Sequence, residues 1–294
     1  MSGWDIADIP DLAGRTYIVT GANSGLGAVT TRALIGAGAR VIMACRNEVK
    51  AHALANELGE RAQVRRLDLA DLGSVREFAD GIDTADVLIN NAGIMAVPHK
   101  RTADGFEMQI GTNHLGHFAL TGLLLDRIRE RVVTVSSGAH AIGKIDLADL
   151  NWEHRRYQRW AAYGQAKLAN LMFTYELQRR LTAAGSTKLS LAAHPGYAAT
   201  DLQSHTESVQ DFLMSIGNRL FAQSAEMGAL PTLYAATSAE VEPGAFYGPG
   251  GLRGLRGHPV RSGSSSASRD EMTARRLWEL SEQLTKVNYS FGRK

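Results

Sequence analysis

The sequence contains a single cysteine, almost no excess charge and no long apolar run. With Cys45 alone among 294 residues, the chain can form no intramolecular disulfide and no zinc cage built from several cysteines. The 32 basic and 30 acidic side chains leave a formal charge of only +2, which argues against nucleic acid and favours a small-molecule partner. No segment approaches the ~20 apolar residues of a membrane span, and residues 1–5 lack the features of a secretory signal. We therefore expect a cytoplasmic protein without a membrane span.

What the sequence does contain is a regular alternation of short β-branched runs and helical segments. Such an alternation predicts an α/β fold, a Rossmann-type doubly wound parallel sheet with helices on both faces, in one domain over residues 1–294. The expected strands are 16–20, 40–44, 64–67, 87–90, 132–136 and 189–193, and the expected helices are 28–37, 48–58, 72–79, 106–128 and 163–181.

The alternation ends after residue 194. Apolar residues at helical spacing over 198–221 are interpreted as an amphipathic substrate lid within 198–226. A last strand is expected at 244–247, a flexible loop at 262–268 and a terminal helix at 272–284.

The first expected strand runs directly into a glycine-rich turn. Glycines allow a tight turn and a close approach of the backbone to a pyrophosphate, and the helix that follows supplies N–H donors. A simple tight turn between a strand and a helix is the alternative. The predicted phosphate-binding residues are Gly21, Asn23, Ser24, Gly25, Leu26 and Gly27.

The ends of the next strands indicate which dinucleotide binds. Where an NAD-binding chain usually presents a carboxylate, this one has Arg46, which can pair with the 2′-phosphate of NADP(H). A solvated arginine is the alternative. Asp68 and Leu69 follow the third strand and are expected near the adenine, although Asp68 fits an N-cap nearly as well. The residues after the fourth strand, Asn91, Ala92 and Gly93, are expected beside the cofactor.

Tyr163 and Lys167 lie at positions i and i+4 of an expected helix and so share a face. An ammonium close to a phenol favours the phenolate, which would lower the phenol pKa from ~10 toward a value useful for proton transfer. Two serines, Ser136 and Ser137, end the fifth strand nearby.

Six motifs in this order resemble the short-chain dehydrogenase/reductase family. Their wording is most similar to the retinol dehydrogenase-like branch, which includes WW-domain oxidoreductases. The motifs are TGANSGLG (20–27), NNAG (90–93), NHLG (113–116), SSGAH (136–140), YGQAK (163–167) and HPGYAAT (194–200).

The resemblance implies hydride transfer between NADP(H) and an alcohol or carbonyl compound of apolar character. It assigns proton transfer to Tyr163, hydrogen bonding of the substrate oxygen to Ser137 (with Ser136 as the substitute), and a contact with the nicotinamide ribose to Lys167. Asn113 would anchor a water that relays protons to Lys167. The family also implies that Pro195, Gly196 and Thr200 hold the nicotinamide amide, and that the chain forms a homo-oligomer through helices such as 163–181.

Some features allow two interpretations. The segment 146–160 is longer than in compact members of the family, and its aromatic residues Trp152, Tyr157 and Trp160 either wall the substrate pocket or pack the extra segment. His114 and His117 share a helix face but lack a carboxylate and a third ligand, so we expect ordinary helix packing and no metal site. The rival functions are a catalytically silent dinucleotide-binding regulator and a sugar-nucleotide epimerase.

Overall fold

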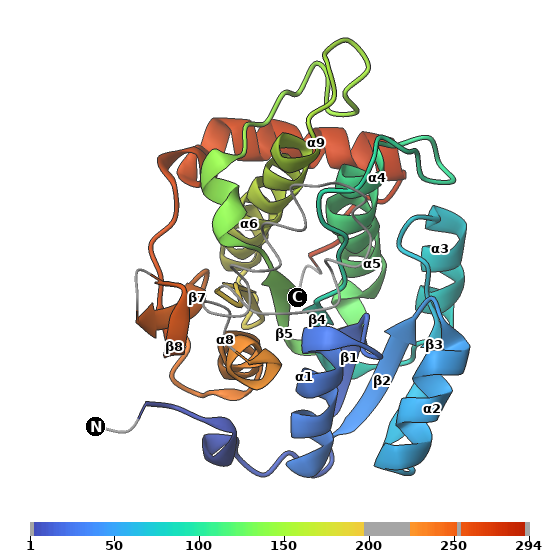
Figure 1. The fold of residues 1–294 in the computed structure, drawn as a ribbon, viewed down its shortest axis with the longest axis vertical. Coiled ribbons are helices and arrows are strands. Elements are labelled where there is room, and N and C mark those ends of the chain that lie inside the picture. The colour runs from blue at the N-terminus through green and yellow to red at the C-terminus, as the bar shows by residue number, and fades with distance from the viewer. Residues whose placement is uncertain (1–2, 197–223, 252–253, 292–294) are drawn as a thin grey trace.

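The computed structural model describes residues 3–196, 224–251 and 254–291 (Figure 1). The strands of these residues form one eight-stranded sheet of order β3-β2-β1-β4-β5-β6-β7-β8, in which only β8 runs antiparallel to its neighbour. The sequence prediction of a doubly wound, mainly parallel sheet is thereby confirmed. The strands are β1 Thr16–Thr20, β2 Arg40–Cys45, β3 Ala62–Arg66, β4 Ala85–Asn90, β5 Ile128–Val135, β6 Leu189–Ala193, β7 Phe246–Gly251 and β8 Arg256–Arg261.

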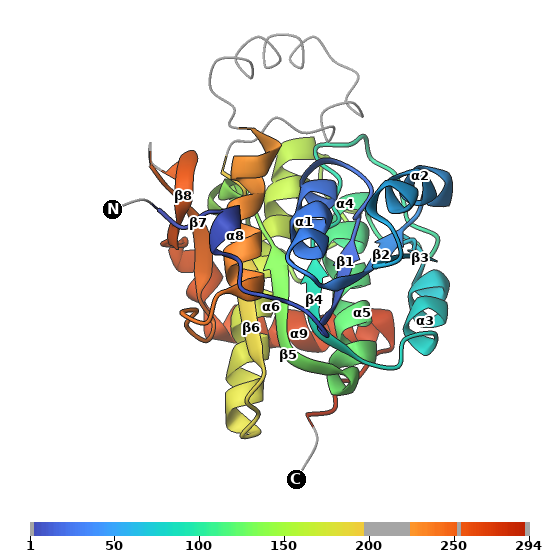
Figure 2. The ribbon, with the colours of Figure 1, turned by 90° about the horizontal axis from the view of Figure 1, so that it is seen from below.

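Helices cover both faces of the sheet (Figure 2). On β1, the side chains of Tyr17 and Val19 pack among α1, α2 and α8, whereas Ile18 packs on the opposite face among α3, α5, α6 and α9. This alternation follows from the two-residue period of a strand and gives the molecule two apolar cores. The helices are α1 Gly25–Gly36, α2 Glu48–Leu58, α3 Leu72–Asp80, α4 Met108–Ile110, α5 Gly116–Leu124, α6 Arg159–Ala183, α8 Ala225–Thr237 and α9 Glu271–Thr285.

The strand order reverses between β1 and β4, which are parallel neighbours. Ligands of open α/β sheets bind at such a reversal, outside the carboxyl ends of the strands. The turns after β1, β4 and β5 all lie at this edge, and they carry most of the residues singled out in the sequence.

The prediction of a single helix over 106–128 is wrong. The segment instead begins with α4, changes to a π-helical turn at Gly111–Leu115, continues as α5, and ends before β5, which starts at Ile128. A Cβ at Gly116 would lie 2.4 Å from the carbonyl oxygen of Leu69, so the helix packs against the β3–α3 connection more closely than any other residue would allow. Apolar periodicity alone does not report such a change in backbone hydrogen bonding.

The C-terminal third also departs from the prediction. The last parallel strand, β7, extends to Gly251, and β8 was missed because its sequence RGHPVR shows no apolar alternation. The expected flexible loop at 262–268 contains a 3-10 turn at Ser266–Arg269, in which the Ser268 hydroxyl donates to the Ser265 carbonyl oxygen at 2.7 Å. Of the predicted lid, only residues 224–226 are described, where Ser224 caps α8; the remainder, 198–223, lies outside the described residues.

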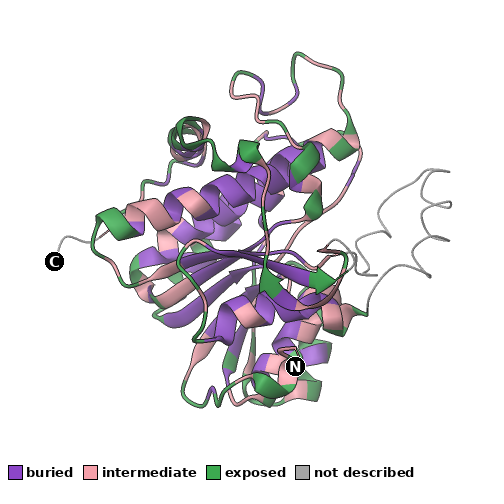
Figure 3. Ribbon diagram, turned by 90° about the vertical axis from the view of Figure 1, so that its left-hand side faces the viewer, coloured by how far each residue is buried: buried purple, intermediate pink, exposed green. Residues whose placement is uncertain are grey.

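α9 crosses over α5 and α6 at the top of Figure 1. Its Trp278 stacks on Phe173 of α6 with ring centroids 5.7 Å apart and an interplanar angle of 15°. This contact covers part of the helix through which we expected copies of the chain to associate, and α6 is buried over most of its length (Figure 3). In the described part of the chain, no helix combines the length and apolar character needed to cross a bilayer.

Candidate active site

The turn between β1 and α1 is closed so tightly that its glycines have no room for side chains. Gly21 and Gly25 have φ values of +65° and +48°, and a Cβ at Gly27 would lie 2.2 Å from the carbonyl oxygen of Gly21. Ser24 is the N-cap of α1 but makes no capping hydrogen bond with its side chain. Since the first amides of a helix attract anions, this uncapped helix end and the narrow glycine cradle fit the pyrophosphate of a dinucleotide.

Arg46 follows β2 directly beside this turn. Its side chain is exposed and has no hydrogen bond or ion pair to the residues that the structure describes. The next residue, Asn47, caps α2 by accepting from the amide of Lys50 at 3.0 Å, and its carbonyl oxygen accepts from the Asn23 side chain at 3.0 Å. The loop that carries Arg46 is therefore tied to the glycine-rich turn while the guanidinium stays available to an anion.

Asp68 and Leu69 lie at the same edge, since β3 pairs with β2 up to Arg66. The N-cap alternative for Asp68 is wrong, because Asp71 caps α3 through the amides of Gly73 and Ser74. Asp68 instead accepts from the amide of Ala70 at 3.0 Å.

The residues after β4 are fixed to the end of β1. The Thr20 hydroxyl accepts from the amides of Asn91 and Ala92, both at 2.9 Å, and the Asn91 side chain donates to the Thr20 carbonyl oxygen at 2.8 Å. A Cβ at Gly93 would lie 3.3 Å from Oδ1 of Asn113 and 3.5 Å from Nζ of Lys167. The loop thus brings the predicted cofactor residues into contact with two of the predicted catalytic ones.

Asn113 lies in the π-helical turn, a distortion that is frequent at functional sites. Its side chain accepts from the amide of Ile94 and donates to the carbonyl oxygen of Ile94, both at 2.9 Å. Lys167 donates from Nζ to the carbonyl oxygen of Val135, the last residue of β5, at 3.1 Å.

The two serines after β5 have different environments. Ser136 is buried and its hydroxyl donates to the Lys167 carbonyl oxygen at 2.8 Å, so it ties α6 to the end of β5. Ser137 begins the 3-10 turn Gly138–Ile142, and its hydroxyl lies close enough to Tyr163 to affect the pKa of the phenol. Ser137 therefore belongs with Tyr163, as the sequence indicated.

The charge state of Tyr163 differs from the sequence expectation. Burial raises the pKa of Tyr163 to about 12, partly offset by the hydrogen bond with Ser137, and burial lowers the pKa of Lys167 to about 8. Nζ of Lys167 lies 5.7 Å from the centre of the Tyr163 ring. The phenol therefore holds its proton at neutral pH.

The last predicted cofactor residues follow β6. Pro195 and Gly196 are described, and Gly196 has a φ of +65° where a Cβ would meet the carbonyl oxygen of Leu255 at 2.4 Å. Thr200 lies outside the described residues.

The aromatic residues of 146–160 divide between the two interpretations. Trp152 is buried, and the Tyr157 hydroxyl donates to the buried carboxylate of Glu107 at 2.8 Å, so these two residues pack the segment. Trp160 is 38% exposed and meets the Tyr163 ring edge-on at 6.1 Å. Only Trp160 is placed to contact a substrate.

Three side chains received no site role from the sequence: those of Thr20, His117 and Glu107. All three are buried polar side chains with several hydrogen bonds. A polar residue within an apolar segment is the signal that could have revealed them. As for His114 and His117, among the described residues no group of three metal-ligating side chains occurs, and both imidazoles pack inside the helix layer.

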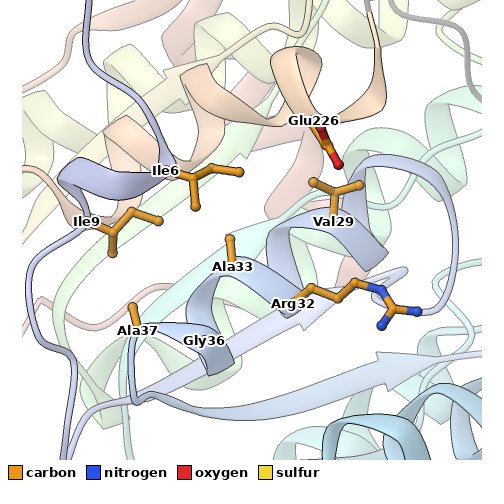
Figure 4. A pocket seen from close by; sticks show the side chains of 8 residues that line it. All are labelled: Ile6, Ile9, Val29, Arg32, Ala33, Gly36, Ala37 and Glu226. Atoms are coloured by element: carbon orange, nitrogen blue, oxygen red, sulfur yellow. The ribbon is translucent and has the colours of Figure 1, made fainter.

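A pocket of about 520 Å³ lies elsewhere, between the outer face of α1, residues 6–9 and the start of α8 (Figure 4). It contains none of the predicted site residues. Its lining consists of Ile6, Ile9, Val29, Arg32, Ala33, Gly36, Ala37 and Glu226.

Comparison with known proteins agrees with this geometry. The family model described as short chain dehydrogenase matches residues 15–211. Retinol dehydrogenase 13 of Homo sapiens is 42% identical over 292 residues, covering 93% of this chain and 85% of the human protein. Retinol dehydrogenase 12 of Homo sapiens is 40% identical over 296 residues, covering 95% and 88%. The crystal structure of an uncharacterised protein from Mycobacterium paratuberculosis has 55% identity and a TM-score of 0.87, covering 98% of this chain and 100% of that one.

Proposed function

Since the chain belongs to the short chain dehydrogenase family and is an oxidoreductase, we propose that it transfers a hydride between NADP(H) and an apolar alcohol or carbonyl compound. The observation that carries the proposal is a cluster at the edge where the strand order reverses: Asn113 and Lys167 lie beside Gly93, and Tyr163 with its partner Ser137 lies beside Lys167. When bound, the dinucleotide supplies or accepts the hydride.

The preference for NADP(H) rests on Arg46. The family uses nicotinamide cofactors of both kinds, so the choice depends on this chain's own residues. An exposed guanidinium without a partner in the described part of the chain, on a loop tied to the glycine cradle, supports pairing with a 2′-phosphate. The two residues between β2 and α2, Arg46 and Asn47, offer no carboxylate to the ribose hydroxyls of NAD(H).

Tyr163 and Ser137 act on the substrate oxygen. With its pKa at about 12, the Tyr163 phenol carries a proton at neutral pH and can give it to a carbonyl oxygen as that oxygen gains negative charge. The Ser137 hydroxyl donates a hydrogen bond to the same oxygen and keeps it near the phenol. Lys167 on α6 bonds the end of β5, and Asn113 in the π-helical turn bonds the loop after β4, so these two side chains hold the elements of the site together.

An apolar substrate is supported by the surface near Tyr163. Trp160 is half-exposed one helical turn before Tyr163, and Ile142, which ends the 3-10 turn after Ser137, is 65% exposed. The relatives named retinol dehydrogenase carry an apolar alcohol in their names. We extend to this chain only the apolar character, since the residues that shape the pocket are not those that carry the motifs.

The two rival functions have less support. A silent regulator has no use for a buried, protonated phenol beside a serine hydroxyl. The sugar-nucleotide epimerases usually space their glycines as Gly-x-x-Gly-x-x-Gly, whereas this turn has Gly21, Gly25 and Gly27.

Two measurements test the proposal. In a fluorescence titration, NADPH should bind at least about tenfold more tightly than NADH, because a charge-assisted pair with the phosphate is worth about 1.5–3 kcal/mol. NADPH consumption should then accompany reduction of an apolar aldehyde or ketone from a panel of such compounds. Equal affinity for the two cofactors would overturn the NADP(H) preference, and NADPH binding without turnover on any compound would favour the regulator.

A further inference from the structure

His117 is a buried imidazole on α5 to which the chemistry proposed above gives no role. It is 1% exposed and lies between the end of β1 and the π-helical turn. Nδ1 is 3.0 Å from the carbonyl oxygen of Asn113, and Nε2 is 2.9 Å from the hydroxyl oxygen of Thr20. One ring therefore touches both the π-helical turn that carries Asn113, which we call the catalytic turn, and Thr20, which holds the loop at residues 91–94, which we call the cofactor loop.

These partners fix the direction of each hydrogen bond. A carbonyl oxygen only accepts, so Nδ1 carries the proton and donates to Asn113. Burial lowers the pKa of His117 to about 3, with the nearby Lys167 charge acting in the same direction, so the ring is neutral and Nε2 accepts from the Thr20 hydroxyl. With its proton committed to His117, the Thr20 oxygen is left to accept from the amides of Asn91 and Ala92.

The hydrogen bonds form a closed circuit around Gly93. Thr20 holds the loop at residues 91 and 92, and the Asn113 side chain holds it two residues later, at Ile94. These two holding groups belong to different elements, β1 and the π-helical turn. His117 connects them, so the loop is clamped at both ends by groups whose separation a single rigid ring determines.

A second hydrogen bond, one helical turn further along, also attaches α5 to the sheet. Thr121 accepts from the Asn90 side chain at 2.9 Å, which ties the same face of α5 to the end of β4. This bond does not involve the backbone amides of the cofactor loop. Among the side chains described, His117 alone joins the Thr20 hydroxyl to the backbone of Asn113.

We propose that His117 is a positioning residue, which sets the distance between the cofactor loop at Thr20 and the catalytic turn at Asn113. The inference rests on the proposed function, because it concerns how the dinucleotide and the catalytic residues are placed relative to each other. The imidazole does not touch the substrate and transfers no proton in the reaction.

Three substitutions separate this role from simple packing. His117→Leu removes both hydrogen bonds, His117→Asn keeps a donor at the position of Nδ1, and His117→Gln keeps an acceptor at the position of Nε2. Because each of them opens the circuit, all three should weaken NADPH binding about fivefold or more and lower kcat about tenfold or more. If His117→Leu does not fold, the two amide variants carry the test.

The matched control is Thr121→Val. Thr121 is a buried polar residue one turn further along the same face of α5, and its hydroxyl is bonded by the Asn90 side chain, not by the loop at residues 91–94 or the turn at Asn113. Substitutions at both positions should lower Tm, whereas only the His117 variants should change the NADPH dissociation constant. If the amide variants lower Tm as Thr121→Val does and bind NADPH as tightly as the wild type, the proposal is overturned.

A spectroscopic measurement on the free protein is independent of activity. In ¹⁵N-histidine NMR, with the His117 signal identified by its loss in His117→Asn, the ring should be the neutral Nδ1–H tautomer. An Nε2–H tautomer could not donate to Asn113 and would contradict the circuit. Failure of the wild type to bind NADPH or NADH would instead overturn the proposed function and leave this tautomer result unaffected.

Discussion

The hydroxyl of Ser136 donates a 2.8 Å hydrogen bond to the backbone carbonyl oxygen of Lys167. This bond anchors the catalytic helix α6 to the end of β5 and uses the only proton that the Ser136 hydroxyl has. The proposed function gives the neighbouring Ser137 a chemical task, so we expect the two adjacent serines to differ in role.

Substitution of the two serines should separate these tasks. Ser137→Ala should lower kcat by about 10²-fold with little change in Tm, since it removes one donor to the substrate oxygen. Ser136→Ala should lower the free energy of unfolding by about 0.5–1.5 kcal/mol, because it removes one buried hydrogen bond between β5 and α6. Thermal melting and steady-state kinetics of both variants check this. A larger loss of kcat in Ser136→Ala would reverse the assignment.

Arg46→Ala should weaken the binding of NADPH and leave the binding of NADH almost unchanged. The guanidinium has no partner in the described part of the chain, so its removal breaks no internal contact, and any loss of affinity comes from the cofactor. About a tenfold increase in the KM for NADPH is expected. Arg32→Ala serves as a control, since Arg32 is a similarly exposed arginine on α1 that is paired with Glu57 at 2.8 Å. Equal losses for both cofactors would mean that Arg46 supports the loop only.

Trp160→Ala should raise KM for apolar substrates and leave the NADPH dissociation constant unchanged. The indole is exposed beside Tyr163, so its removal deletes apolar contact area outside the cofactor site. Met272→Ala, which removes a 70% exposed side chain on α9, is the control for loss of surface apolar area. An unchanged KM in Trp160→Ala would place the substrate elsewhere.

Acid should destabilise the protein below about pH 6.5. Burial lowers the pKa of His114 to about 4, of His117 to about 3 and of His194 to about 4, so in this range the unfolded chain binds protons that the folded one excludes. Stability therefore falls as pH falls from about 6.5 to about 4, at up to about 1.4 kcal/mol per pH unit for each histidine. In urea unfolding at several pH values, the free energy of unfolding should fall less steeply with falling pH in His114→Gln than in the wild type. Parallel slopes would mean that His114 is not buried as a neutral ring.

Sequence reasoning recovered the parts of this molecule that depend on local pattern. The strand and helix alternation predicted the doubly wound parallel sheet and most of its strands, because β-branched runs and helical spacing are local properties. It did not find the π-helical turn, β8 or the 3-10 turn after residue 265, since each depends on which distant groups supply hydrogen bonds. The pKa of Tyr163 was misjudged for the same reason, because the neighbouring Lys167 is visible in the sequence but the burial of the Tyr163 phenol is not.

The measurement that tests the central claim most directly is the transfer of labelled hydride. The wild type is incubated with NADPH carrying two deuterium atoms at C4 and a panel of apolar aldehydes and ketones, and the products are analysed by mass spectrometry. The account predicts an alcohol with one added deuterium from the wild type, and at least about 10²-fold less of it from Tyr163→Phe, which keeps the ring and removes the hydroxyl group. Undiminished deuterium transfer by Tyr163→Phe, or none by a wild type that binds NADPH, would contradict it.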